Sequence, residues 1–332
     1  MIAAQVGNTQ APSASQVGEQ IRARVECLSF LPTTVGVAMK LVELRKDPKA
    51  GANEYAKIIA SDASLCTKVL ALANSSWFGV RNKVTKPLVA VNLLGLGTVR
   101  TLAINTCLTG LHHELRLTPE EARRLWAASL CKAVAAKQFA WLNNATVADE
   151  AFAAGLMQDL ALPILYACAR TPIGAMLEDV GLDVASRLRG EQAICDLDHM
   201  QLGDLVAKRL QLPELFGAAV AHHHDLEALR SCVGEQTVAS AVYAASLFPH
   251  MLNGWNPADA AELRSFFDKQ TGGRSGSFEQ YLETVQTLFA SLYRYFDGGS
   301  APEARLMELL TLATREAADS AIEMIGALRN QR

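Results

Sequence analysis

Four of the seven histidines in this chain fall in one stretch: His199, then His222, His223 and His224, followed directly by Asp225. Imidazole clusters with a nearby carboxylate bind zinc, iron or manganese, and many such sites carry out hydrolysis. Adjacent residues on a helix point about 100° apart, so three consecutive histidines cannot all face one cavity. Taken alone, the triplet therefore favours a solvated helix end, where cations are favourable, over a metal site.

A second candidate is the polar pair Gln158 and Asp159, which follows the helix predicted for residues 151–157 and interrupts an apolar run. A buried carboxylate is costly unless it is paired or coordinates a cation, and either role would make Asp159 a site residue. Alternatively, Asp159 caps a helix that begins at once with Leu160. The sequence leaves both interpretations open.

Helices must position these residues. Only 6% of the 332 residues are aromatic, and the alternating runs of Val, Ile, Thr and aromatics that mark strands are missing, which predicts an all-α fold. The clearest helix start is residues 118–121, Thr-Pro-Glu-Glu, which combine an N-cap, an early proline and a capping-box glutamate. We expect that helix to run toward Trp141 with Arg123, Arg124, Lys132 and Lys137 facing outward.

Composition divides the chain into three parts. Residues 1–20 are predicted to be a flexible lead-in, residues 21–250 a multi-helix main domain, and residues 251–332 a C-terminal helical extension. Within the main domain, Asn53 and Thr98 are predicted helix caps. The C-terminal region has an apolar stripe around Tyr281 and Phe289, which should pack on the main domain or on a second copy. The glycine-rich residues 272–276 are its predicted mobile joint, and Pro302 should begin the last helix.

Charge and cysteine content restrict the partners. Lys and Arg total 31 against 34 Asp and Glu, a net charge of −3, so no bulk attraction to nucleic acid or an anionic membrane is expected. No apolar run is long enough to span a bilayer, and the first 20 residues do not form a secretory signal. The seven cysteines are scattered without a CxxC pair, which favours reduced thiols in a cytoplasmic protein.

One short segment is both basic and aromatic, with Trp77 and Phe78 followed by Arg81, Lys83 and Lys86. Such a patch could stack on nucleic acid bases and neutralise phosphates. Because the pattern is not repeated and the chain is acidic overall, a solvated loop is the preferred interpretation.

Several motifs, in order along residues 22–250, resemble the HDOD domain, a bacterial output domain related to the HD and HD-GYP phosphohydrolases. The resemblance includes the run Leu72-Ala73-Asn74-Ser75-Ser76, the pair Leu94-Gly95, the segment Ala154-Gly155-Leu156, His199 with Leu202-Gly203, Leu212-Pro213-Glu214 and His223-His224. It implies structural roles for Asn74, Ser75, Gly95 and Pro213. Residues beyond 250 are not covered.

The resemblance also implies a degenerate pocket. A catalytic HD domain has a histidine on the helix that contains Ala128 here, a His-Asp pair in place of Gln158 and Asp159, and histidines that resemble His199 and His223. Alanine cannot coordinate a metal and a glutamine oxygen is a weak neutral ligand. We therefore expect Ala128, Gln158, Asp159, His199, His223 and His224 to line a pocket without metal or cofactor. Three of these, Asp159, His199 and His223, should hydrogen-bond one another.

The function implied by the resemblance is that of a non-catalytic regulator in bacterial signal transduction. Its partners would be signalling proteins of unknown identity, with self-association possible, and neither nucleic acid nor membrane. Two alternatives remain open. One is a metal-dependent phosphohydrolase, acting on a cyclic nucleotide with a reduced ligand set. The other is a small-molecule sensor that uses the degenerate pocket.

Overall fold

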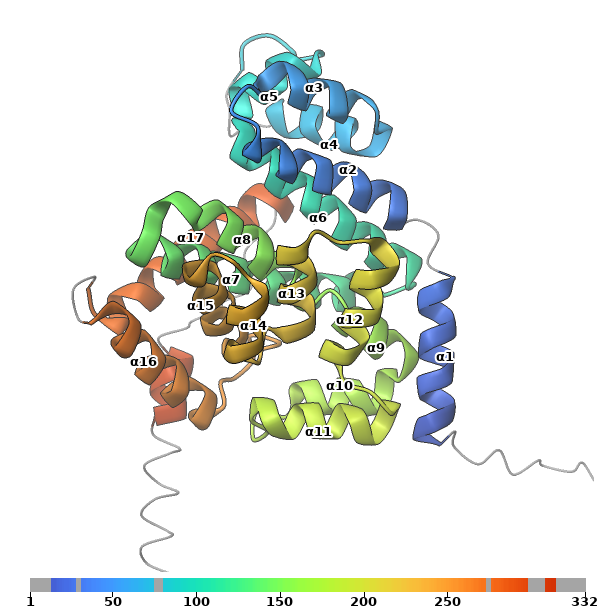
Figure 1. The fold of residues 1–332 in the computed structure, drawn as a ribbon, viewed down its shortest axis with the longest axis vertical. Helices are drawn as coiled ribbons and strands as arrows, with labels where there is room; N and C mark the ends of the chain where they lie inside the picture. Colours follow the sequence, from blue (N-terminus) through green and yellow to red (C-terminus); the bar gives the residue numbers. More distant parts are fainter. Residues whose placement is uncertain (1–12, 28–30, 75–79, 273–275, 298–307, 315–332) are drawn as a thin grey trace, which may run out of the picture.

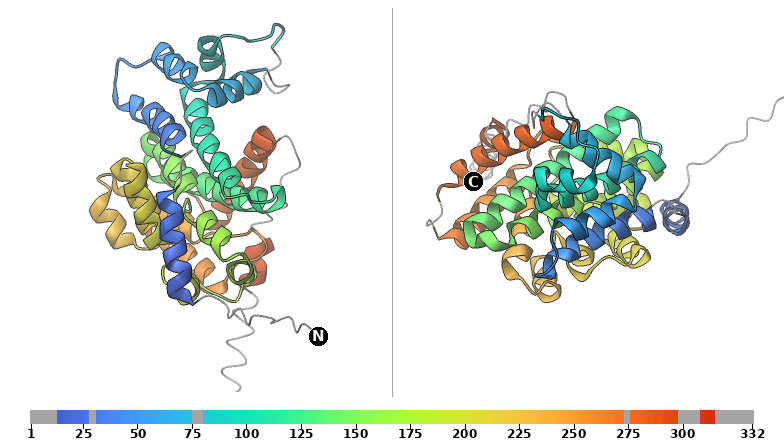
Figure 2. Two further views of the ribbon diagram at one scale, coloured as in Figure 1. Left: turned by 90° about the vertical axis from the view of Figure 1, so that its right-hand side faces the viewer. Right: turned by 90° about the horizontal axis from the view of Figure 1, so that it is seen from above.

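The computed structural model describes residues 13–27, 31–74, 80–272, 276–297 and 308–314. These residues form helices, turns and loops and contain no strand, which confirms the all-α prediction. The chain is divided between a small lobe at one end and a larger helical body (Figures 1 and 2).

The lobe, defined as residues 31–95, consists of short helices stacked at the top of the molecule in Figure 1. These are α2 (Leu31–Glu43), the 3-10 turn η1 (Leu44–Lys46), α3 (Ala52–Ala60), α4 (Ala63–Ala73) and α5 (Pro87–Leu94). Gly95, with φ of 79°, ends α5 and begins α6 (Leu96–Glu114), and the two helices meet at 110°. Because this φ is readily reached only by glycine, Gly95 permits the sharp bend through which α6 enters the body.

Arg100 of α6 holds the lobe to the body. Its guanidinium donates to the Tyr55 hydroxyl of α3 (3.1 Å) and to Asp149 Oδ2 (3.1 Å). Inside the lobe, Asn74 joins α4 to the segment before α5, because its side chain accepts from the Val84 amide and donates to the Val84 carbonyl, both at 2.8 Å. These contacts connect segments that are distant in sequence.

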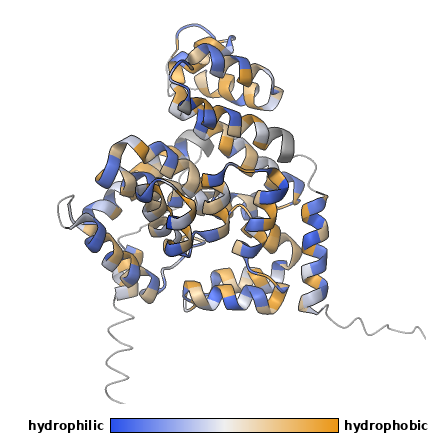
Figure 3. Ribbon diagram, viewed as in Figure 1, coloured by the Kyte–Doolittle hydropathy of each residue, from blue (hydrophilic) through white to orange (hydrophobic). Residues whose placement is uncertain are grey.

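The body is built around α7 (Pro119–Asn144), the helix whose capping box at Thr118 and Glu121 is confirmed. The other body helices are α1 (Ala14–Glu26), η2 (Ala145–Val147), α8 (Ala148–Met157), α9 (Leu162–Cys168), α10 (Arg170–Glu178), α11 (Val184–Cys195), α12 (His199–Leu210), α13 (Glu214–His222), α14 (Leu226–Cys232) and α15 (Gln236–Ser246). Helices α8 and α15 pack against α7, while α1 packs on α11, α12 and α9. Apolar and hydrophilic residues alternate along most helices, as amphipathic packing requires (Figure 3).

The C-terminal helices α16 (Pro257–Thr271) and α17 (Phe278–Asp297) pack on α7, as the apolar stripe of the sequence predicts. The Tyr281 hydroxyl donates to the Ala135 carbonyl at 3.0 Å, and its ring stacks on Phe267, with centroids 5.0 Å apart. The Ser277 capping box with Gln280 is present. Residues 273–275 of the expected joint and the expected start at Pro302 lie outside the described residues.

Several predicted helix boundaries are wrong by a few residues. Gly95 rather than Thr98 precedes α6, and Gly51 rather than Asn53 precedes α3. The prediction of a flexible lead-in is wrong for residues 14–20, because Ser13 caps α1 and the helix begins at Ala14. Pro163 lies in the first turn of α9, where a missing amide donor has no cost.

One stretch, Pro119–Cys168, contains a window apolar and uncharged enough for a membrane span, although the sequence shows no continuous apolar run of that length. In the structure 83% of this window is buried inside the molecule. This stretch is not one straight helix but covers α7, η2, α8 and α9, and its most apolar part lies in α8 and α9. Packing of α7, α13 and α15 on α8 accounts for that composition, since a core helix is apolar on several faces.

Gly155 sets the distance between α7 and α8. A Cβ atom on Gly155 would lie 2.9 Å from the Ala136 Cβ and 3.1 Å from the Lys132 carbonyl oxygen. We predict that Gly155→Ala lowers the free energy of unfolding by about 1–3 kcal/mol, because the two backbones must separate. Urea denaturation measures this loss. Gly36→Ala in α2, with no heavy atom within 4 Å, is the control and should be neutral or slightly stabilising; equal stabilities of the two variants would contradict the prediction.

Candidate functional site

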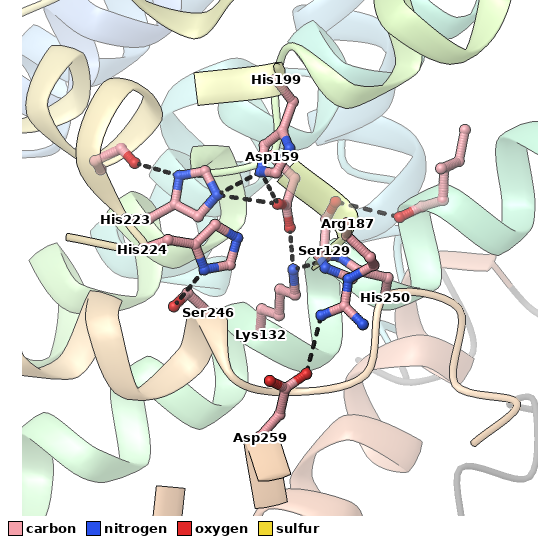
Figure 4. A network of polar contacts seen from close by, with 12 residues as sticks. Ser129, Lys132, Asp159, Arg187, His199, His223, His224, Ser246, His250 and Asp259 are labelled. Carbon is pink, nitrogen blue, oxygen red and sulfur yellow. Dashed lines mark hydrogen bonds and ion pairs between the residues drawn. The ribbon is translucent and has the colours of Figure 1, made fainter. Parts of the chain in front are cut away.

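The helices of the body bring a set of polar side chains together in the centre of the molecule (Figure 4). They are Lys132 of α7, Asp159 after α8, Arg187 and Glu191 of α11, His199 at the start of α12, His223 and His224 at the end of α13, Ser246 and His250 at and after the end of α15, and Asp259 of α16. We call this set the central network. Its members are buried, apart from the partly buried His224.

The strongest contact of the central network is an ion pair between Lys132 and Asp159. The Lys132 ammonium is fully buried and donates to Asp159 Oδ2 at 2.6 Å and to His250 Nδ1 at 3.2 Å. Burial lowers the pKa of Lys132 from its ordinary value, against the attraction of Asp159. Burial also opposes ionisation of Asp159, but Lys132 and neighbouring histidines outweigh it and hold the pKa of Asp159 well below its usual range.

A second chain of hydrogen bonds joins α11, α12 and α13. His223 Nδ1 donates to the Ala219 carbonyl (3.0 Å), which leaves its Nε2 as an acceptor in the neutral ring. His199 Nε2 lies 3.0 Å from that nitrogen, and His199 Nδ1 lies 2.7 Å from Glu191 Oε2. Burial alone would lower the pKa of His199, but Glu191 and Asp159 outweigh it and raise the pKa, favouring an imidazolium that donates from both nitrogens.

His224 and Gln158 have polar atoms that the surrounding side chains do not satisfy. The Ser246 hydroxyl donates to the Tyr243 carbonyl (2.8 Å), so it accepts the bond from His224 Nδ1 at 3.1 Å. The Nε2 of His224 and both amide atoms of Gln158 are buried without a hydrogen-bond partner. Burial also lowers the pKa of His224 well below its ordinary value. The neutral imidazole of His224 therefore presents an unprotonated nitrogen to the protein interior.

The C-terminal region completes the central network through Asp259 of α16. Asp259 Oδ2 accepts from the Arg187 guanidinium at 3.0 Å, and Oδ1 accepts from the Val184 amide at 3.1 Å. The network then contains three cations (Lys132, Arg187 and the His199 imidazolium) and three carboxylates (Asp159, Glu191 and Asp259). Buried charges of opposite sign therefore compensate one another.

Several sequence-based interpretations of this region are wrong. Lys132, expected to face outward, is fully buried, because α8, α15 and α17 cover several faces of α7. His223 is also fully buried, so the histidine triplet is not a solvated helix end. The Asp159 side chain does not cap α9, since Ala161 is the N-cap residue and Asp159 binds Lys132. Ala128 is buried one helical turn before Lys132 and adds no polar group.

The sequence reasoning missed six members of the central network: Lys132, Arg187, Glu191, Ser246, His250 and Asp259. One signal was available for Lys132, which lies between Cys131 and Ala133 in an apolar stretch of α7. For the others the sequence has no comparable signal, because they are brought together by contacts between helices distant in the chain.

Of the four residues for which the resemblance implies structural roles, the structure describes three. Asn74 ends α4 and makes the contacts with Val84 described above, while Gly95 forms the bend between α5 and α6. Pro213 is the N-cap residue of α13, directly after the connection from α12. Ser75 lies outside the described residues. The three described positions shape loops of the fold and do not contact the central network.

A cavity of ≈ 360 Å³ opens between the lobe and the body, away from the central network. Its lining includes Arg45, Arg100, Glu150, Phe152 and Phe216, from η1, α6, α8 and α13. No member of the central network lines this cavity. A small molecule bound there would therefore contact the junction of lobe and body rather than the degenerate pocket.

Comparison with known protein families shows which family this chain belongs to. The HDOD domain profile matches residues 31–226, more than half of the sequence, so the chain belongs to the HDOD domain family. An uncharacterized protein of Treponema pallidum is 24% identical over 293 residues, which cover 83% of this chain and 52% of the relative. The chain thus spans about half the length of that relative.

Solved structures have the same fold. An HDOD domain protein of unknown function from Geobacter sulfurreducens is 21% identical with a TM-score of 0.53, and the match covers 95% of this chain and 98% of that one. A protein named "Putative phosphohydrolase" from Shewanella amazonensis is 18% identical with a TM-score of 0.53, covering 83% and 95%. Both matches show that this chain shares the fold of these proteins.

The Lys132–Asp159 pair can be tested by a double-mutant cycle. Lys132→Met or Asp159→Asn alone should lower the free energy of unfolding by about 3–5 kcal/mol, because each leaves an uncompensated buried charge. The double variant should be more stable than the sum of the two losses predicts. Urea denaturation of all four proteins measures the coupling, and additive losses would show that the two groups do not interact.

The buried histidines predict acid sensitivity. Burial lowers the pKa of His223, His224 and His250, and that of His112 to about 4, whereas the pKa of His199 is raised. Below the unfolded pKa of about 6.5 the unfolded chain binds more protons at the four depressed sites, so stability is lost as pH falls. His199 acts in the opposite direction, because its pKa is raised. Its contribution to the free energy of unfolding is fully present below about pH 6.5 and is lost as pH rises through its folded-state pKa.

We therefore predict that the free energy of unfolding decreases between pH 7 and pH 5, by up to about 1.4 kcal/mol per pH unit for each histidine that must remain neutral. Urea denaturation at several pH values measures the slope. His250→Asn should make the slope shallower, whereas His113→Asn, at an exposed position, should not. A stability independent of pH over this interval would contradict the charge assignment.

Proposed function

We propose that this chain is a non-catalytic, cytoplasmic regulatory protein of bacterial signal transduction that acts through contacts with other proteins. The observation that carries the proposal is the position of the Lys132 ammonium, 2.6 Å from the Asp159 carboxylate. In an HD-type hydrolase this carboxylate would be a metal ligand. Here an internal cation binds it, and the helix that would supply a histidine supplies Ala128 and Lys132 instead.

A divalent cation fits this arrangement poorly. It would lie close to a buried ammonium, and the charges of the central network already compensate one another, so its two positive charges would be uncompensated. His199 also donates from both nitrogens and has no free lone pair for a metal in that form. Without a metal to polarise water, the site lacks the nucleophile that phosphoester hydrolysis requires.

A metal-dependent phosphohydrolase is the second candidate, favoured by two observations. The ligating atoms of His199, His223 and His224 lie within 4.8 Å of one another, which is close enough to hold a metal ion. His224 Nε2 is moreover without a partner. If this site bound metal, His199 would lose a proton, the bond between His199 and His223 would break, and Asp159 would have to be shared with Lys132.

Metal analysis separates the two candidates. We predict well below one equivalent of manganese, iron or zinc per chain by mass spectrometry of the purified protein, and no hydrolysis of cyclic dinucleotides or of a nitrophenyl phosphodiester with manganese or iron added. Stoichiometric metal, together with hydrolysis that Asp159→Ala abolishes, would overturn the proposal. Adding manganese should not change the melting temperature of the native protein, since no preformed site binds the metal.

A further inference from the structure

Helix α5 of the lobe has an exposed aliphatic face. Leu88, Val89 and Leu93 are 36%, 48% and 37% exposed, whereas Ala90, Val91 and Leu94 on the opposite face are buried. Val89 and Leu93 are one helical turn apart, and Leu88 adjoins them. In an eight-residue helix, three large aliphatic side chains that remain this exposed form a candidate contact surface.

Cations lie next to this aliphatic face. Arg81, Lys83 and Lys86 directly precede α5 and are exposed, and in the part of the chain that the structure describes none of them forms an ion pair. The sequence contains no Asp or Glu from residue 63 to residue 113. The positive charge beside α5 is therefore not neutralised by the segments that adjoin it in sequence.

The carboxylates of the helices that pack on α5 are engaged elsewhere. Helices α3 and α4 pack on α5, and their acidic residues both cap helices: Glu54 Oε2 accepts from the Gly51 amide (2.9 Å) and Asp62 Oδ1 from the Leu65 amide (2.8 Å). The lobe as a whole contains nine Lys and Arg and four Asp and Glu, a net charge of +5 in a chain of net charge −3. The lobe is thus positive on a molecule that is otherwise acidic.

We propose that this surface binds an acidic amphipathic segment of a partner protein. The α5 surface consists of Leu88, Val89 and Leu93 together with Arg81, Lys83 and Lys86. The aliphatic side chains would contact the apolar face of the segment and the cations would attract its carboxylates. The lobe projects from the body, so a partner can reach α5 without displacing another element (Figures 1 and 2). This proposal rests on the proposed function, because it names the kind of partner through which the regulatory protein would act.

The side chains of the α5 surface favour an acidic protein segment over nucleic acid and over an anionic membrane, which a cationic surface also attracts. Phosphate binding uses cations and hydrogen-bond donors, and gains nothing from three exposed aliphatic side chains. Membrane binding requires apolar side chains that reach into the acyl boundary, whereas those of α5 are more than half buried in the lobe. An acidic segment with its own apolar face matches both parts of the surface.

The experiment uses full-length protein and a fluorescein-labelled helical peptide of about five turns, with leucines at helical spacing on one face and glutamates on the other. Fluorescence anisotropy should detect binding that increasing salt weakens. The double variants Leu88→Ser/Leu93→Ser and Lys83→Glu/Lys86→Glu should each weaken it roughly tenfold or more. A peptide with lysine in place of glutamate should not bind. Circular dichroism should show unchanged folding, as is usual for exposed substitutions.

A matched control lies on α12, where Leu205 is 37% exposed and the Lys208 side chain 72% exposed. Leu205→Ser/Lys208→Glu should keep the affinity of the native protein. Equal binding of both peptides, or full affinity in the α5 variants, would overturn the proposal. The proposal would also be overturned if the protein bound an oligonucleotide or phosphatidylglycerol vesicles more tightly than the peptide, and the α5 variants abolished that binding. Bound metal with turnover would contradict the proposed function but would leave the peptide result unchanged, so the two failures are distinguishable.

Discussion

The buried ion pair between Lys132 and Asp159 is the contact on which the centre of this molecule depends. It joins α7 to the turn after α8, and the close approach of those two helices at Gly155 brings the two groups into range. Removing either charge would leave the other in a low-dielectric interior, where an unpaired ion is very unfavourable. The histidines from α12, α13 and the segment after α15 are arranged around this pair, so their protonation states depend on it.

The central network also unites parts of the chain that the sequence separates. Asp259 lies in the C-terminal region, beyond the residues matched by the HDOD profile, yet it accepts hydrogen bonds from Arg187 and from the Val184 amide of α11. Tyr281 of α17 adds a contact to the middle of α7. The C-terminal helices therefore contribute charge balance as well as apolar cover, which places them within the structural unit of the body.

The helical class and several helix boundaries could be predicted from the sequence, because capping boxes such as that of Thr118 and apolar periodicity are local signals. The family resemblance predicted that Asp159, His199 and His223 hydrogen-bond one another. His199 and His223 do so at 3.0 Å, whereas Asp159 Oδ1 lies 3.4 Å from His223 Nε2 without a hydrogen bond. The apolar neighbours of Lys132 were a local signal of burial, but too weak to decide, since a lysine beside small residues on a long helix fits an outward face equally well. His250 and Asp259 were missed because only tertiary packing brings them to the centre.

A lysine ammonium differs from a metal ion in one respect that matters for the cell: it is attached to the chain by covalent bonds. If, as proposed, Lys132 takes the place of a metal, the core would be complete as soon as the polypeptide folds, and it would require no metal uptake and no loading step. Chelators and mis-metallation would then have no target at this position. The helical architecture would assemble equally in metal-starved and metal-replete cells.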